Sequence, residues 1–283
     1  MFRNIRKTLC LILLSAAVVS SSYGAEKLRY QMVKGNTYKY ILTADTKSTV
    51  QAMGQEMASN VGNYFSISLV VENATPEGIT LVAKVDSNLS RIESMMMKDS
   101  AMVMKEINGK RVRLSLSPLG KIVKSVVIDT VVPSRAMQMT GTGNPAEFLR
   151  QLFVKLPEQA VGVGDTWKYT TTDTTSAQGM SIITKPDVQF KITGTEKVGS
   201  YDCLKITFEG TASVYGTGSR QGMEMVIDGT TKSKGTTFFA PKEGLLVSVE
   251  SESTTDMNIS GTGEQMFTAT QSSKTAQKMK LAK

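Results

Sequence analysis

Apolar and polar residues alternate along most of the chain, in short runs rich in Thr, Ser, Val and Ile. An alternation with a period of two is typical of strands that bury one face and expose the other. Turns containing Gly, Asn-Gly or Pro separate these runs at the spacing of an antiparallel sheet. The pattern predicts strands at 37–43, 64–72, 79–86, 111–116, 121–128, 167–172, 188–193, 202–209, 236–239 and 245–250, and turns at 76–78, 108–109, 197–200 and 242–244.

One segment follows a helical period instead. Asn144 suits an N-cap, Pro145 the first helical position and Glu147 the third. The apolar residues that follow recur on a single stripe, which predicts a helix over 144–156 that packs on a concave sheet face. A weaker helical segment is expected over 94–105, where methionines cluster.

An internal repeat relates the two halves of the chain. Residues 34–40 are echoed by 163–169, and residues 118–125 by 241–248. In the first pair, a turn glycine and a small polar residue lead into a strand that carries an aromatic residue. These residues are Gly35, Asn36 and Tyr38 in one copy and Gly164, Asp165 and Trp167 in the other.

These patterns predict a mainly β (α+β) fold class. We expect two duplicated antiparallel β units, about 28–130 and 160–268, which form a curved sheet or open barrel around one central helix. The absence of a low-complexity linker beside the helix favours two halves that share a core, so residues 25–273 are predicted to be a single domain.

The N-terminal segment has the layout of a secretory signal peptide, because three basic residues precede an apolar run at 9–19 that is too short to span a bilayer. Small residues at 22 and 24 predict cleavage before Ala25, so residues 1–24 are the expected signal peptide. Cys10 lies inside the apolar run, and no cysteine follows at a lipid-attachment position. We therefore expect an exported, unlipidated protein, periplasmic or secreted, without a transmembrane span.

Charge narrows the range of partners. The formal net charge is +8, and about +1 remains once the three cations of the signal and the four lysines of residues 274–283 are set aside. Those last ten residues are predicted to be a basic disordered tail. No basic stripe with interleaved aromatic residues is visible, which argues against nucleic acid as a partner.

The chain contains no histidine. This removes the commonest general base, the Ser-His-Asp and Cys-His arrangements, and most zinc sites. Acidic residues occur singly on strands and turns, where solvated faces explain them better than a paired-carboxylate hydrolase does. Asp165, with its repeat partner Asn36, suits an Asx-type turn. We expect no enzyme activity, no cofactor and no metal site.

The lone cysteine after the signal, Cys203, is predicted to be either a buried structural thiol or a half-exposed one. Several glycines are interpreted as strand-edge glycines that mark bends in a curled sheet rather than as a phosphate loop. They are Gly141, Gly143, Gly216, Gly218, Gly222, Gly261 and Gly263. The 17 methionines are interpreted first as core packing, then as lining of an adaptable apolar pocket, and last as soft metal ligands.

The signal peptide, the paired Gly-[Asn/Asp]-Thr-aromatic openings and the stretch 153–167 resemble an uncharacterised bacterial family of exported proteins, a domain of unknown function. The layout is also similar to the open β-barrels with an enclosed helix of envelope lipoprotein carriers. The first resemblance implies export, and the second implies the architecture alone.

The function predicted is a non-enzymatic envelope protein that binds an apolar or lipid-like ligand in a cavity beside the helix. The expected lining residues are Met137, Met139, Phe148, Leu152 and Phe153. The alternative is a structural or protein-interaction module whose strands recognise another envelope protein by edge pairing or surface contact. A hydrolase that uses carboxylates is the less favoured third class.

Overall fold

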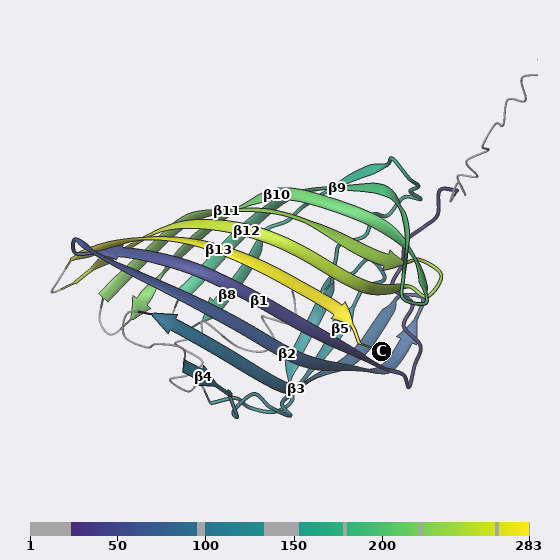
Figure 1. Cartoon of the computed structure of the whole chain (residues 1–283), viewed down its shortest axis with the longest axis horizontal. Coiled ribbons are helices and arrows are strands. Elements are labelled where there is room, and N and C mark those ends of the chain that lie inside the picture. The colour runs from purple at the N-terminus through teal and green to yellow at the C-terminus, as the bar shows by residue number, and fades with distance from the viewer. Residues whose placement is uncertain are drawn as a thin grey trace, which may run out of the picture.

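The computed structural model describes residues 24–94, 100–132, 153–177, 180–220, 223–263 and 266–282. These residues form one antiparallel sheet of 13 strands (Figure 1). The strands are β1 (Thr37–Ala52), β2 (Gln55–Thr75), β3 (Gly78–Ser94), β4 (Ser100–Met102), β5 (Arg111–Leu116), β6 (Ile122–Val127), β7 (Thr166–Thr170), β8 (Asp173–Ala177), β9 (Met180–Val198), β10 (Tyr201–Arg220), β11 (Met223–Ala240), β12 (Leu245–Thr262) and β13 (Phe267–Leu281).

Each half of the chain forms a meander, and β13 joins the two. The strand order is β6-β5-β3-β2-β1-β13-β12-β11-β10-β9-β7, with β4 beside β3 and β8 beside β9. The last strand therefore lies between the first strand and β12. Eight of the ten strands predicted from the alternation fall inside observed strands, whereas 121–128 and 167–172 overlap β6 and β7 and extend beyond them. The predicted turns connect sequential elements. The two halves share one continuous sheet, as expected.

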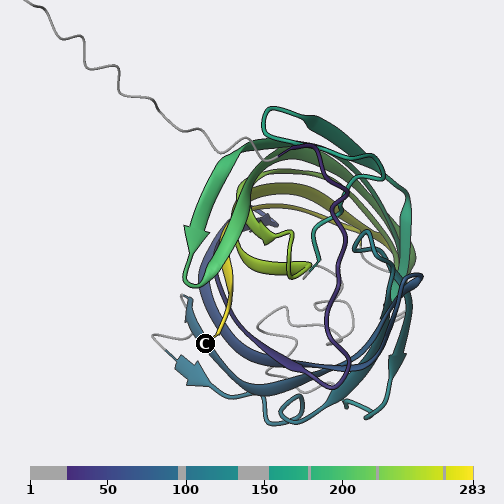
Figure 2. The same ribbon diagram turned by 90° about the vertical axis from the view of Figure 1, so that its right-hand side faces the viewer.

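The sheet curls strongly, and Figure 2 shows its strands passing around a common axis while the N-terminal segment crosses one end. We call this end, covered by residues 24–36 and 153–165, the base, and the opposite end, at the β1–β2 hairpin, the tip. In the described strands, β6 and β7 are the two ends of the pairing path, so hydrogen bonding does not close the sheet.

Glycines inside the strands make the strong curvature possible. A Cβ on Gly210 would lie 2.5 Å from the Asp187 carbonyl oxygen, and one on Gly229 would lie 2.6 Å from the Asp256 carbonyl oxygen. Side chains cannot occupy such positions, so backbones approach there more closely than an ordinary residue would allow. Of the glycines predicted to mark bends, Gly216, Gly218 and Gly261 lie inside strands, whereas Gly141, Gly143 and Gly222 lie outside the described residues.

The hydrophobic core fills the base. Tyr30, in the N-terminal segment, makes edge-to-face contacts with Phe153 and Phe239, with ring centroids 5.5 and 5.4 Å apart. Such aromatic pairs add to the stabilisation that burial alone provides. Around them pack fully buried residues from both halves, which include Leu42, Ile67, Leu69, Leu81, Leu114, Leu116, Ile192, Leu204, Ile206 and Leu246.

The two opening motifs of the sequence repeat have the same local structure. Both glycines have a left-handed backbone, with φ of 86° at Gly35 and 100° at Gly164. Each motif then makes the same three backbone hydrogen bonds, 2.8–3.1 Å long. They join Gly35 N to Val71 O, Val71 N to Asn36 O and Asn36 N to Val33 O in one copy, and Gly164 N to Ile192 O, Ile192 N to Asp165 O and Asp165 N to Gly162 O in the other.

The predicted central helix is not supported where it can be examined. Residues 144–152 lie outside the described residues, and residues 153–156 are not helical. Their backbone groups bond to other segments, because Leu156 N donates to the Leu119 carbonyl oxygen (3.0 Å) and the Tyr30 hydroxyl donates to the Val154 carbonyl oxygen (3.2 Å). The described residues contain no helix, so the fold observed is all-β.

The predicted helix over 94–105 is wrong for the residues that are described. β3 continues to Ser94, and β4 pairs with it through Ser90 opposite Met102 and Ile92 opposite Ser100. Pairing with β3 satisfies the backbone of this segment, while residues 95–99 lie outside the described part of the chain.

The prediction of a disordered C-terminal tail is also wrong. Residues 274–281 are the second half of β13 and pair with β1 on one side and β12 on the other. Lys274, Lys278 and Lys280 alternate with Thr275, Gln277 and Met279, so the lysines occupy one face of a central strand. Because lysines are frequent in this segment, the period-two pattern was not recognised in the sequence.

The predicted signal peptide lies almost wholly outside the described residues, which begin at Gly24. Within the described ranges, no helix is long and apolar enough to cross a membrane.

Candidate functional site

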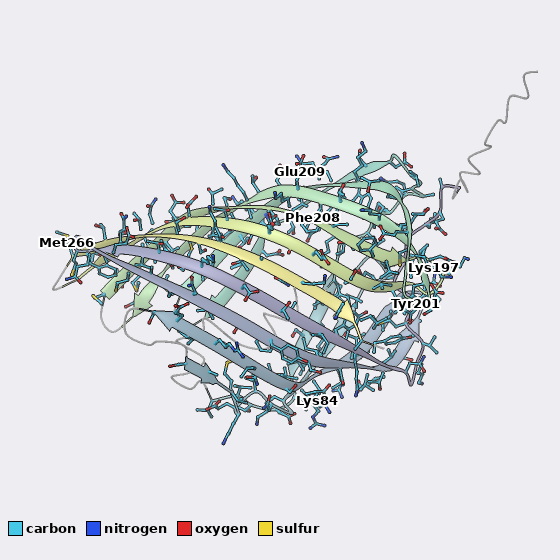
Figure 3. All side chains as sticks on the ribbon, viewed as in Figure 1. Lys84, Lys197, Tyr201, Phe208, Glu209 and Met266 are labelled. Carbon is cyan, nitrogen blue, oxygen red and sulfur yellow. The ribbon has the colours of Figure 1, made fainter. Side chains whose placement is uncertain are left out.

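The two faces of the curled sheet differ in chemistry. Because side chains alternate along a strand, residues that share a face can be followed from strand to strand by register. Phe208 and Glu209 illustrate this on β10: Phe208 contacts Phe190 on the core side (ring centroids 5.9 Å apart), whereas Glu209 is exposed on the other (Figure 3). We call the core side the inner face and the opposite side the outer face.

Beyond the core, the inner face carries rows of small hydroxyl side chains. Register places Thr46 opposite Thr275, which faces Ser253 and then Ser233. The next row toward the tip is Ser59, Ser48, Ser273, Thr255 and Thr231. We call these nine residues the hydroxyl belt. All of them are half-buried, so they line the concave side without being packed into the core.

Closer to the tip, the inner face becomes apolar again. The next two rows also contain Gln55, Gln271 and Thr184, but most of their larger side chains are aliphatic or thioether groups, which we call the apolar rim. They are Val50, Met57, Ile182, Val214, Ile227, Met257 and Ile259. Met57 is 45% exposed, and the others are half-buried.

The outer face carries the charges of these strands. It has a depression of about 850 Å³ across β9–β13 and β1, lined by threonines and by side chains of both signs, among them Asp45, Lys191 and Glu209. Two ion pairs cross it, Lys278 with Glu250 and Lys234 with Glu252. Because these pairs are more than half exposed and the charges nearly balance, we interpret this depression as a solvated face.

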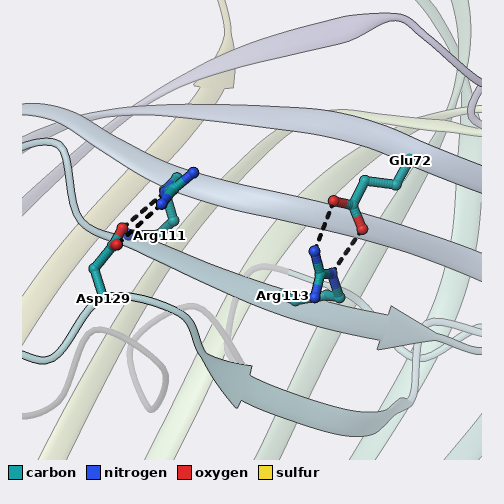
Figure 4. A network of polar contacts seen from close by, with 4 residues as sticks. All are labelled: Glu72, Arg111, Arg113 and Asp129. Atoms are coloured by element: carbon teal, nitrogen blue, oxygen red, sulfur yellow. Dashed lines mark hydrogen bonds and ion pairs between the residues drawn. The ribbon is translucent and has the colours of Figure 1, made fainter.

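Two further ion pairs fasten the first half of the sheet (Figure 4). Arg113 on β5 makes two hydrogen bonds to Glu72 on β2, 2.7 and 3.0 Å long, and so reaches across β3. Arg111 binds Asp129 in the same manner. The hydrogen bonds from each guanidinium lower the pKa of the facing carboxyl group. Both arrangements are exposed and structural.

The structure places one of the predicted ligand-lining residues, Phe153, and it lies in the core, 5% exposed against Tyr30. The other four, Met137, Met139, Phe148 and Leu152, lie outside the described residues. The motif residues Tyr38 and Trp167 occupy equivalent places near the base. Trp167 is buried and stacks on Phe190, whereas Tyr38 is half-buried.

Asp165 and Cys203 have structural environments. The Asp165 carboxylate accepts a hydrogen bond from Gly162 N (2.8 Å), which fixes the turn before β7. Cys203 is buried beside Ala240 and Val247, and burial raises the pKa of its thiol to about 11. The half-exposed alternative for this thiol is therefore wrong. Within the described residues, no three Cys, Asp or Glu side chains gather into a group that could hold a metal ion.

Lys155 carries a largely buried amine that the sequence did not single out. Its Nζ donates to the carbonyl oxygens of Gly120 (2.5 Å) and Phe153 (3.3 Å). Burial lowers the pKa of this amine to about 8, partly offset by the charge of Asp173. Because Leu156 also bonds to Leu119, and Trp167 Nε1 donates to the Lys155 carbonyl oxygen (3.0 Å), this segment connects the two ends of the sheet at the base.

We expect Lys155 to make the stability depend on pH. The pKa of about 8 in the folded state is below the ordinary value of 10.5, so the charged amine destabilises the folded state. This destabilisation decreases as the pH rises from 8 towards 10.5. The free energy of unfolding of the wild type should rise relative to that of Lys155→Met by about 1 kcal/mol between pH 8 and 9. Urea unfolding at both pH values measures this difference.

The exposed Lys124 on β6 gives the control, because Lys124→Met should follow the wild type at both pH values. An unchanged difference between wild type and Lys155→Met would contradict a buried, destabilising charge at position 155. Comparison with a variant also cancels the opposite contribution of Cys203, whose raised pKa reduces stability above pH 9 in both proteins.

Sequence reasoning missed the belt and the rim. Their signal was the alternation of Ser and Thr with Lys and Glu, as in residues 231–234 and 250–253. This pattern has period two but little hydrophobic contrast, so it was not interpreted as part of a strand with a distinct inner face.

No protein-family model and no curated protein sequence matches the chain. Solved structures that match the chain include the following three. One is lipovitellin, described for its lipid-protein interactions (14% identity, TM-score 0.48, covering 89% of this chain), and this chain spans only 26% of the lipovitellin chain. The others are an outer membrane channel from Pseudomonas putida F1 (10% identity, TM-score 0.26, 89% and 98% covered) and an exported protein with a YmcC-like fold from Bacteroides fragilis (11% identity, TM-score 0.25, 90% and 97% covered).

Proposed function

We propose that this chain is an exported, non-enzymatic binding protein of the cell envelope, which holds an apolar or lipid-like molecule against the inner face of its curled sheet. The observation that carries the proposal is the apolar rim. Half-buried Met, Ile and Val side chains lie on the concave side of the sheet, beyond the packed core.

Concave apolar surfaces with few polar groups are the usual sites for small apolar ligands. The rim side chains are not part of the main core cluster, which ends nearer the base. The alternation that places Ile227 on the inner face leaves Val226, its neighbour on β11, on the outer face and 38% exposed. The two faces therefore offer different environments to an apolar molecule at the same depth along the strand.

The proposal predicts that the neutral apolar dye N-phenyl-1-naphthylamine binds the wild-type protein and becomes fluorescent. Ile227→Asp places an unpaired charge on the inner face and should weaken binding about tenfold or more, because a carboxylate opposes the burial of an apolar ligand. The matched variant Val226→Asp should bind like the wild type.

Solvent extraction followed by mass spectrometry of the purified protein should also recover an apolar molecule. The proposal fails if the folded wild type does not bind the dye, or if both variants lose binding equally.

A second candidate function, recognition of another envelope protein by strand pairing, is favoured by one observation. β6 is an end strand of the described sheet, and its valines Val123, Val126 and Val127 are 64%, 39% and 42% exposed. Exposed apolar end strands can pair with a strand of another chain. A pull-down from envelope extracts with wild type and with Val126→Lys distinguishes this function, since only the wild type should retain a stoichiometric partner.

A further inference from the structure

The hydroxyl belt adds chemical detail to the proposed function and suggests the class of ligand. Resting on that function, we propose that the ligand is an uncharged amphiphile, with apolar chains against the apolar rim and a neutral hydroxyl-bearing or ester-bearing head against the belt. The inference depends on how charge and hydroxyl groups are distributed over the inner face.

In every strand that contributes to the belt, the charged side chains next to the belt residues lie on the outer face. Lys47, Lys232 and Lys274 each stand between two belt residues in the sequence, yet the alternation places all three on the outer face. In the rows that form the belt and the rim on the described strands β1, β2 and β9–β13, the inner face carries no Asp, Glu, Lys or Arg. A ligand that carried a net charge would find no opposite charge there, and it would lose its hydration without compensation.

The belt is polar but partly satisfies its own hydrogen bonds. The hydroxyls of Thr46 and Thr275 lie 3.0 Å apart, and those of Thr231 and Thr255 lie 2.9 Å apart. Gln271 Nε2 donates to the Ser48 hydroxyl (3.2 Å). Hydroxyl groups have further donor and acceptor capacity, so they can also pair with neutral groups of a ligand at little cost. A ligand that is a simple hydrocarbon would leave this capacity unused.

An acidic side chain, Asp173, does lie on the inner side of the described sheet, outside the belt but in line with the first row of the rim. Asp173 on β8 faces Thr184 of β9, at the end of the sheet, and it is exposed. Its charge acts on the amine of Lys155. Asp173 and Lys155 carry opposite charges, so they partly offset each other at this end of the sheet.

The test compares two lipids with identical chains, dioctanoylglycerol and dioctanoyl phosphatidic acid, by displacement of the bound dye. Wild-type protein should bind the neutral lipid at least about tenfold more tightly. β13 supplies a matched pair of variants, since Ser272 is exposed on the outer face and Ser273 lies in the belt. Ser273→Lys should reverse the preference in favour of the phosphatidic acid, and Ser272→Lys should leave it unchanged.

Ser273→Gln separates the effect of charge from that of size, because it adds a long side chain that is neutral; it should keep the preference for the neutral lipid. Equal or tighter binding of the phosphatidic acid by the wild type overturns the inference while leaving the proposed function intact. Binding of the dye with displacement by neither lipid overturns the inference in the same way. A folded wild type that binds neither dye nor lipid rejects the proposed function itself.

Discussion

Gly235→Val should destabilise the protein by about 3 kcal/mol or more, because the added side chain has no space. A Cβ at Gly235 would lie 2.5 Å from Cζ of Phe208, and the Glu250 carbonyl oxygen is closer still. The variant must displace the Phe208 ring from the core or move β11 away from β12. Urea denaturation monitored by circular dichroism measures the loss.

Gly194 on β9 provides the control, because nothing lies within 4 Å of a Cβ placed there. Valine favours extended backbone and restricts the unfolded chain more than glycine does, so Gly194→Val should be neutral or stabilising by up to about 1 kcal/mol. Equal losses from the two substitutions would show that steric contact at Gly235 is not what demands glycine.

Trp167→Ala should cost about 3–5 kcal/mol, the range for removal of a large buried aromatic side chain. The indole stacks on Phe190 with ring centroids 5.1 Å apart and an interplanar angle of 8°. Its N–H also donates to the Lys155 carbonyl oxygen, so truncation leaves that acceptor without this partner and loosens the segment that connects the two ends of the sheet. Thermal and urea unfolding measure the effect.

The equivalent residue of the first repeat motif, Tyr38, makes fewer contacts. It is half-buried, and its hydroxyl accepts a hydrogen bond from Val33 N (3.2 Å). We therefore expect Tyr38→Ala to cost less than half as much as Trp167→Ala. Equal losses of stability would mean that the two aromatic residues stabilise the fold equally despite their different burial.

The strand predictions succeeded where apolar contrast was strong. Residues 37–43 and 202–209 were recognised because their apolar residues face the core at the base. The same strands continue to Ala52 and Arg220, through segments in which Ser, Thr and Gly replace the apolar residues. Hydrophobic periodicity fades there although hydrogen bonding between strands continues, so the strands were predicted too short.

The candidate site could be inferred only in part from the sequence. The prediction placed it in a cavity beside a helix, and three of the five predicted lining residues came from the apolar stripe of that helix. Of these three, Phe153 instead fills the core against Tyr30. The belt is built from residues such as Thr46 and Thr275, which are 229 positions apart in the chain. Only the register between β1 and β13 shows that they are neighbours, and this register cannot be inferred from local sequence patterns.

The central position of β13 in the sheet determines the order in which the strands can assemble. A chain is made from its N-terminus, so β1 and β12 exist before the strand that must lie between them. Until residues 267–281 emerge, each half presents one long strand with unpaired backbone groups, and the rows of the inner face stay interrupted. β13 therefore completes the sheet last. A nascent chain that lacks it exposes the edges of β1 and β12 in addition to those of β6 and β7, and such unpaired edges favour aggregation.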